Sequence, residues 1–180
     1  MAYLRDLSQR EAAGVPVTAT GGCFLCDAAA ARPQDDPDAA RQRFVLINDD
    51  RGVVLLNRYP YTNGHLLIAP REHLATLTAL SSAQRAGLMD LTAVGERLLG
   101  SALNPQGYNM GVNLGRCAGA GLPGHLHIHV VPRWSGDTNF MQTVAQTRVV
   151  PDALETSYAH LLAALEALAL EDEGGSDEGD

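Results

Sequence analysis

The sequence predicts an α+β fold, organised as a single domain over residues 1–170. Five short segments have the composition or the alternation of strands, and two longer segments carry apolar residues at helical spacing. Turns containing Gly, Asn or Pro separate these segments. With 180 residues, 46% of them hydrophobic, the chain is long enough to bury a core without disulfide bonds.

Five segments are predicted strands, because each is a short run of apolar or alternating residues between turn-forming residues. They are residues 44–47, 53–57, 66–70, 108–114 and 124–134. The turn Asn48–Gly52 predicts that the first two strands form a β-hairpin. Residues 1–20 are expected to be an N-terminal lead-in, and the proline-broken stretch 28–42 an exposed loop.

Two segments are predicted helices. The first has an N-cap serine at Ser81 and a stripe of leucines, and it ends near Leu103, where Asn104–Gly107 stops it. The second covers residues 152–170. Residues 171–180 are acidic, contain several glycines and lack apolar side chains, so they are expected to form a disordered tail.

Composition excludes several classes of partner. The formal net charge is -8, but the tail supplies six acidic residues, so the remainder is near -2 and lacks the basic footprint of a nucleic-acid-binding protein. No apolar run is long enough for a membrane span, and Met1–Asp6 begins no signal peptide. Three cysteines, two of them in a C-x-x-C, favour a reducing cytoplasm.

All 13 basic residues are arginine. The absence of lysine excludes a Walker lysine, a Schiff base and an adenylated lysine. Any covalent chemistry on phosphorus must therefore use another nucleophile.

Three histidines alternate with aliphatic residues at positions 125, 127 and 129. On a strand this spacing places His125, His127 and His129 on one face, with about 7 Å between neighbouring positions of that face. Three interpretations are open: an accidental polar face, a mononuclear metal site made by all three imidazoles, and a histidine nucleophile steered by its neighbours.

Cys23 and Cys26 form the C-x-x-C. Such a pair is a redox couple, one half of a zinc site, or two reduced cysteines packed in a loop. A redox pair usually follows a strand and opens a helix, and no strand is predicted before Cys23. Half a zinc site needs two further ligands, and His73 is available downstream.

The histidine segment and its flanks resemble the histidine triad (HIT) family. The pattern H-x-H-x-H followed by two apolar residues is similar to the family signature, and Asn109–Gly115 and Pro132–Asp137 extend the match. The pattern N-R-x-P-x-x-x-G-H at Asn57–His65 is similar to the branch of fragile-histidine-triad hydrolases and diadenosine tetraphosphate phosphorylases. This resemblance covers about residues 23–152 and implies a HIT-like fold, a five-stranded antiparallel sheet with a central and a C-terminal helix.

The resemblance implies an enzyme that cleaves dinucleoside polyphosphates, such as diadenosine tetraphosphate, through a covalent nucleotidyl-histidine. His127 would be the nucleophile, and the catalytic set implied is His65, His125, His127 and His129. Asn57 and Asn113 match positions that hold the ribose and the phosphate. The glycine-rich loop adds Gly115, where the backbone can approach phosphate oxygens, and the positive charge of Arg116.

Two other functions stay open, a Hint-type purine nucleoside phosphoramidase and a non-catalytic nucleotide-binding regulatory protein. Hydrolysis and phosphorolysis differ only in the acceptor that discharges the intermediate. Members of the family often carry Gln, Ser or Thr shortly before the first triad histidine, and this chain has Gly121, Leu122 and Pro123 there instead.

The resemblance also implies a structural zinc ion bound by Cys23, Cys26, His73 and His125. Four protein ligands would close the coordination sphere, so the zinc would not take part in the chemistry, and no metal is required for attack by a histidine. The family pairs into homodimers, so a homodimer is expected here.

Overall fold

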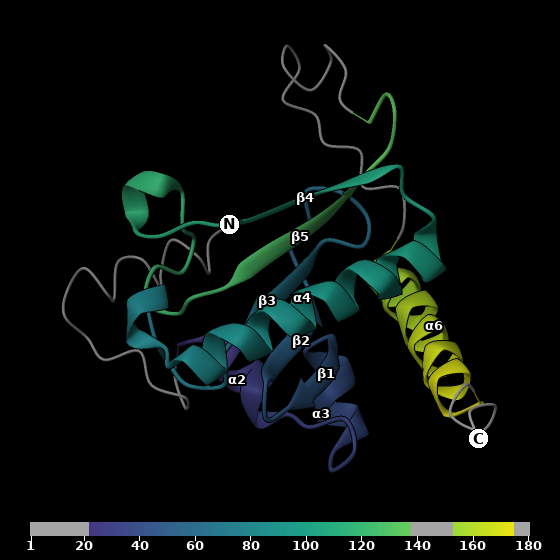
Figure 1. Cartoon of the computed structure of the whole chain (residues 1–180), viewed down its shortest axis with the longest axis horizontal. Helices are drawn as coiled ribbons and strands as arrows, with labels where there is room; N and C mark the ends of the chain where they lie inside the picture. Colours follow the sequence, from purple (N-terminus) through teal and green to yellow (C-terminus); the bar gives the residue numbers. More distant parts are fainter. Residues whose placement is uncertain (1–21, 138–152, 175–180) are drawn as a thin grey trace.

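The computed structural model describes residues 22–137 and 153–174. Their five strands form one antiparallel sheet in the order β1-β2-β3-β5-β4, with helices packed on both faces (Figure 1). The strands are β1 (Val45–Asp49), β2 (Gly52–Leu56), β3 (Leu66–Ala69), β4 (Gly107–Val112) and β5 (Ile128–Arg133). The predicted α+β class with a five-stranded antiparallel sheet is confirmed.

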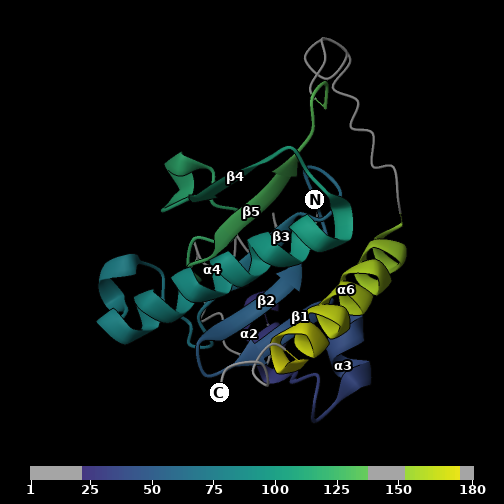
Figure 2. The same cartoon turned by 45° about the vertical axis from the view of Figure 1, so that its right-hand side comes forward.

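Two long helices cover one face of the sheet (Figure 2): α4 (Ser82–Leu103) crosses the strands and α6 (Leu154–Gly174) lies beside it. The helix α4 begins as predicted, because Ser81 and Gln84 form a capping box, and it ends where Asn104 takes the left-handed conformation. Its buried leucines pack on the aliphatic side chains that β2, β3 and β5 direct to this face.

The opposite face carries a short helix, α2 (Phe24–Ala30), packed on a second apolar cluster with Leu55 and Leu67. The amide of Asn48 donates hydrogen bonds to the carbonyl oxygens of Ala29 and Ala31, each at 3.0 Å, and so holds the C-terminal end of α2 against β1. These contacts fix the position of the two cysteines that begin α2.

The prediction of an exposed loop over residues 28–42 is wrong in part. The segment contains the end of α2 and a second short helix, α3 (Pro37–Gln42). Pro37 occupies the first turn of α3, where a missing N–H costs nothing, and the side chain of Asp36 accepts a hydrogen bond from the N–H of Ala39. Proline therefore starts a helix here.

The predicted strand over residues 124–134 is shorter in the structure, because β5 begins only at Ile128. Before it, the N–H of Leu126 donates to the carbonyl oxygen of Leu74 at 2.6 Å instead of joining the sheet. The predicted alternation persists across this irregular stretch. Leu126, Ile128 and Val130 lie in the core below α4, and the three histidines point to the other face.

The expected tail begins later than residue 171. The helix α6 continues to Gly174, and the carboxylate of Asp172 accepts two hydrogen bonds from Arg97 on α4, at 2.6 and 3.0 Å. This pairing extends the helix beyond its last apolar contact. Residues 175–180, like the lead-in 1–20, lie outside the described residues. Within the described part, no helix is both long and apolar enough to cross a bilayer.

Candidate active site and metal-binding cluster

Four polar side chains meet on the sheet face opposite α4. His129 lies on β5, whose register pairs it with Leu67 on β3 and with Gly111 on β4. His65 comes directly before β3 and Asn57 directly after β2, so the β2–β3 hairpin places the two residues side by side. His65 is fully buried and His127 is 6% exposed, so the cluster forms part of the protein interior.

Hydrogen bonds fix the tautomers of two of these histidines. The backbone N–H of Tyr61 donates to Nδ1 of His65 at 3.1 Å, and the amide of Asn57 lies 3.2 Å from the same nitrogen. A backbone N–H can only donate, so neutral His65 carries its proton on Nε2. That proton is directed at Nδ1 of His129, 2.9 Å away. His129 therefore carries its own proton on Nε2 and offers it as a donor.

A carbonyl oxygen fixes the tautomer of His127. Nδ1 of His127 donates to the backbone oxygen of His125 at 2.8 Å. Neutral His127 then has a lone pair on Nε2, and among the described residues nothing hydrogen-bonds to that nitrogen. The rings of His127 and His129 lie edge to face, with centroids 4.9 Å apart. A nucleophilic nitrogen and a hydrogen-bond donor thus stand side by side.

Burial keeps these imidazoles uncharged. It lowers the pKa of His65 to about 3, with a smaller contribution from the neighbouring His129. It lowers the pKa of His129 to about 4, and it lowers the pKa of His127 although the bond to the His125 carbonyl opposes this shift. At neutral pH the candidate nucleophile is therefore unprotonated.

Tyr61 is a member of this site that sequence reasoning missed. Its ring packs on His65 at a centroid distance of 4.6 Å and lies nearly parallel to the ring of His129 at 6.0 Å. The side chain is 49% exposed, so it borders the site. The only signal in the sequence is its place in the loop between Asn57 and His65, where the family pattern leaves the residue type open.

The remaining predicted binding residues come from the segment between β4 and β5. Asn113 is half-buried and directly follows β4. Gly115 and Arg116 lie on an exposed turn, η2 (Arg116–Ala118), where Gly115 has a φ of 80° that favours glycine. The structure thus brings His65, His127, His129 and Asn57 into one cluster, while Gly115 and Arg116 stand on its exposed surroundings.

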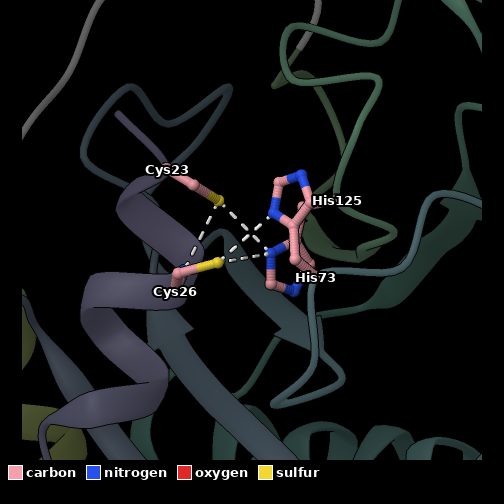
Figure 3. Close-up of side chains that lie close together, drawn as sticks. All are labelled: Cys23, Cys26, His73 and His125. Carbon is pink, nitrogen blue, oxygen red and sulfur yellow. Dashed lines mark hydrogen bonds between the residues drawn. The ribbon is translucent and has the colours of Figure 1, made fainter. Parts of the chain in front are cut away.

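The four predicted metal ligands come together in a second cluster (Figure 3). One ligand atom each from Cys23, Cys26, His73 and His125 lies within 4.8 Å of the others, and in Figure 3 the four side chains point toward a common centre. Nδ1 of His125 lies 3.2 Å from Sγ of Cys23, and Nδ1 of His73 lies 3.3 Å from Sγ of Cys26. Tetrahedral zinc with sulfur and nitrogen ligands separates neighbouring ligand atoms by about 3.5 Å.

The chemistry of this donor set fits a bound metal ion. Nε2 of His125 donates to the carbonyl oxygen of Pro70 at 2.9 Å, which leaves the lone pair of Nδ1 facing the sulfurs. Both cysteines are reduced, and burial raises the pKa of Cys23 to about 12. A divalent cation would offset the cost of deprotonating the buried thiols, because it binds and stabilises the thiolates. The chain therefore holds a Cys₂His₂ group able to bind a metal.

His125 connects the two clusters. Its imidazole belongs to the Cys₂His₂ group, and its backbone oxygen orients His127. Its side chain faces the cysteines and Pro70, so His125 contacts His127 through its backbone carbonyl and not through its imidazole. Asn48, which anchors α2 below the cysteines, was missed because its place in the sequence is typical of a turn.

Comparison with known proteins agrees with this geometry. The family model for the HIT domain matches residues 39–136. The chain is 36% identical over 143 residues to a protein named AP-4-A phosphorylase from Mycobacterium tuberculosis, covering 73% of each chain.

Solved structures show the same fold. A zinc-bound histidine triad family protein from Mycobacterium smegmatis superposes with a TM-score of 0.62 at 30% identity, covering 86% of this chain and 99% of that one. The diadenosine triphosphate hydrolase of Plasmodium falciparum shares the fold at 18% identity, with a TM-score of 0.57, over 70% of this chain and 78% of that one. The chain belongs to the histidine triad family.

Proposed function

We propose that this protein is an enzyme that cleaves dinucleoside polyphosphates, with diadenosine tetraphosphate as the model substrate, through a nucleotidyl-histidine intermediate. The observation that carries the proposal is the arrangement of His127, a buried neutral imidazole whose Nδ1–H is held by a carbonyl while Nε2 keeps its lone pair. The similarity to the AP-4-A phosphorylase supports the choice of substrate.

In the first step, Nε2 of His127 attacks the α-phosphorus in line. The N–P bond forms as the P–O bond to the distal phosphates breaks, and the distal nucleotide leaves as an anion. The lowered pKa of His127, caused by burial, keeps the lone pair available at neutral pH. The carbonyl oxygen of His125 keeps the ring oriented, and its hydrogen bond from Nδ1–H stabilises the positive charge that develops on the imidazole.

The Nε2–H of His129 donates to a phosphoryl oxygen in this step, because His65 holds its other nitrogen as an acceptor. Asn113 and the backbone N–H groups near Gly115 stabilise the remaining phosphate charge, with Arg116 as a fixed cation. Asn57 holds the ribose. In the second step, water or inorganic phosphate attacks the phosphorus and releases His127.

We further propose that the metal held by Cys23, Cys26, His73 and His125 is zinc. Zinc prefers this tetrahedral thiolate and imidazole set, and a closed site serves structure rather than catalysis. The zinc-bound relative supports this assignment. A bound zinc ion would join α2 to the segment before β5 by coordination bonds. It would thereby fix the backbone carbonyl that orients His127.

A homodimer and a cytoplasmic location complete the proposal. The strand β4 lies at the edge of the sheet, and Met110 on its α4 side is 42% exposed, which supports a contact with a second copy. Three free cysteines support a reducing compartment. Light scattering should give twice the chain mass, and Met110→Glu should reduce it.

The assay that tests this function uses diadenosine tetraphosphate with and without inorganic phosphate, with products separated by chromatography. Formation of ADP only with phosphate indicates a phosphorylase, and AMP with ATP in its absence indicates a hydrolase. His127→Asn should abolish either reaction while nucleotide binding persists. Turnover of a phosphoramidate alone would favour the Hint-type alternative, and binding without any turnover the regulatory alternative.

A further inference from the structure

The two faces of β4 differ in the size of their side chains. Toward α4 it presents larger residues, of which Tyr108 and Val112 pack against the core. Alternation directs a different set to the histidine face. In order along the chain, that set is Gly107, Asn109, Gly111 and, directly after the strand, Asn113.

Nothing in the fold requires glycine at position 111. Its backbone lies outside the left-handed region, and a Cβ built on it would meet no atom within 4 Å. Glycine in the middle of a strand is destabilising relative to alanine. Yet Gly111 is the direct partner of His129 in the β4–β5 register. A glycine inside a strand, next to a candidate catalytic histidine, is typical of a place where a ligand approaches the backbone.

His129 lies on β5, which the sheet order places between β3 and β4. Its Nδ1 accepts from His65, which lies on the β3 side. The ring of Tyr61 also lies against His129. The donating Nε2–H lies on a different flank of the ring from Nδ1, and Gly111 is the residue that β4 places beside His129.

Asn109 continues this surface with hydrogen-bond donors. Nη1 of Arg133 donates to Oδ1 of Asn109 at 2.6 Å, and both Nε and Nη2 of Arg133 are held by Asp137, at 2.5 and 2.6 Å. This contact uses the amide oxygen of Asn109 as an acceptor, and its NH₂ group remains as the donating end of the side chain. Amide N–H groups and a neighbouring guanidinium suit phosphate oxygens.

We propose that the leaving portion of the substrate, the distal phosphates and second nucleoside, lies along this face of β4, crossing Gly111 toward the amide of Asn109. Gly111 then determines specificity, because its missing side chain admits a large leaving group. The inference rests on the proposed function, in which the retained nucleotide binds near Asn57. The sheet order places β4 and β2 on opposite sides of β5.

The test compares Gly111→Val with Gly107→Val, a substitution on the same face and strand that is also free of contacts within 4 Å but pairs with Arg133. Two substrates share the adenylyl group: diadenosine tetraphosphate, and adenosine 5′-phosphofluoridate, whose leaving group is a single fluoride. In both, His127 forms the same N–P bond while the P–O or P–F bond breaks.

Gly111→Val should lower kcat/KM for the dinucleotide by about tenfold to a hundredfold, the cost of one steric overlap. The kcat/KM for the phosphofluoridate should change less than about twofold, because a fluoride leaving group does not reach the added side chain. Gly107→Val should leave both reactions unchanged. Unaltered melting temperatures are expected, since valine suits an extended strand. If Gly111→Val lowers the melting temperature, Gly111→Ser must give the same split between substrates.

Equal losses with both substrates would overturn the inference, because Gly111 would then serve the shared phosphorus. No loss with either would overturn it as well. If the unsubstituted protein turns over neither substrate, the result is a different one and refutes the proposed function itself.

Discussion

At the scale of single residues, the candidate site depends on which nitrogen carries each proton. The backbone N–H of Tyr61 sets the tautomer of His65, His65 sets that of His129, and a carbonyl sets that of His127. None of these assignments requires a charged imidazole. In the proposed mechanism His65 is a positioning residue, because it acts on the substrate only through His129.

Substitution of His65 tests this chain of hydrogen bonds. His65→Ala should lower kcat/KM by about tenfold to a hundredfold, the cost of one buried hydrogen bond left unmade. His65→Gln should recover much of that loss, since a glutamine can accept from Tyr61 with its oxygen and donate to His129 with its nitrogen. Equal activity of the alanine and glutamine variants in steady-state kinetics would contradict the positioning role.

At the scale of elements, the sequence predicted what depends on local pattern. The five strands and two long helices follow from apolar periodicity, and the N-cap at Ser81 follows from its residue type. The short helices α2 and α3 were missed, since a stretch with two prolines and many polar residues resembles a loop until the cap at Asp36 is seen. The late start of β5 depends on a contact with Leu74, which no local pattern reveals.

The metal-binding cluster joins elements far apart in the chain, so its test belongs to this scale. Elemental analysis should find about one zinc per chain, and Cys23→Ser should lose it together with part of the thermal stability. Cys117→Ser is the matched control, because Cys117 is exposed and outside the cluster. A stable protein without zinc, or a Cys23→Ser variant that keeps the metal, would refute the zinc assignment.

At the scale of the whole molecule, the buried histidines link stability to pH. Burial lowers the pKa of His65 from 6.5 to about 3, so below pH 6.5 the unfolded chain binds a proton that the folded chain does not. The free energy of unfolding therefore falls as the pH drops toward about 3, by up to about 1.4 kcal/mol per pH unit for this histidine. His129 and His127, whose pKa values are also lowered by burial, add to the same trend.

Urea denaturation between about pH 7 and about pH 5 measures this linkage. The free energy of unfolding of the unsubstituted protein should fall on acidification. That of His65→Gln should fall less steeply, because about one proton fewer is bound on unfolding. Any metal released from the Cys₂His₂ group would contribute equally to both proteins, so the difference isolates His65. Parallel pH profiles would show that His65 is protonated in the folded state.

The whole site could be predicted only in part. The spacing of the triad and of the C-x-x-C predicted the histidine face and the paired cysteines, and the resemblance to the family predicted the full Cys₂His₂ group, which the structure brings together. The contribution of Tyr61, the contact of His127 with the backbone carbonyl of His125 and the open space at Gly111 arise from the three-dimensional arrangement of the strands and loops. These features could be recognised only once the register of the strands and the positions of the loops were known.

The central claim is that His127 becomes covalently nucleotidylated. The most direct measurement is mass spectrometry of the protein quenched during turnover of diadenosine tetraphosphate, followed by peptide mapping. The account predicts a gain of one adenylyl group on the peptide that contains His127, absent in His127→Asn. The adduct should be discharged by solvent water if the enzyme is a hydrolase, and by added phosphate if it is a phosphorylase. Turnover without any adduct, or an adduct that persists in His127→Asn, would contradict it.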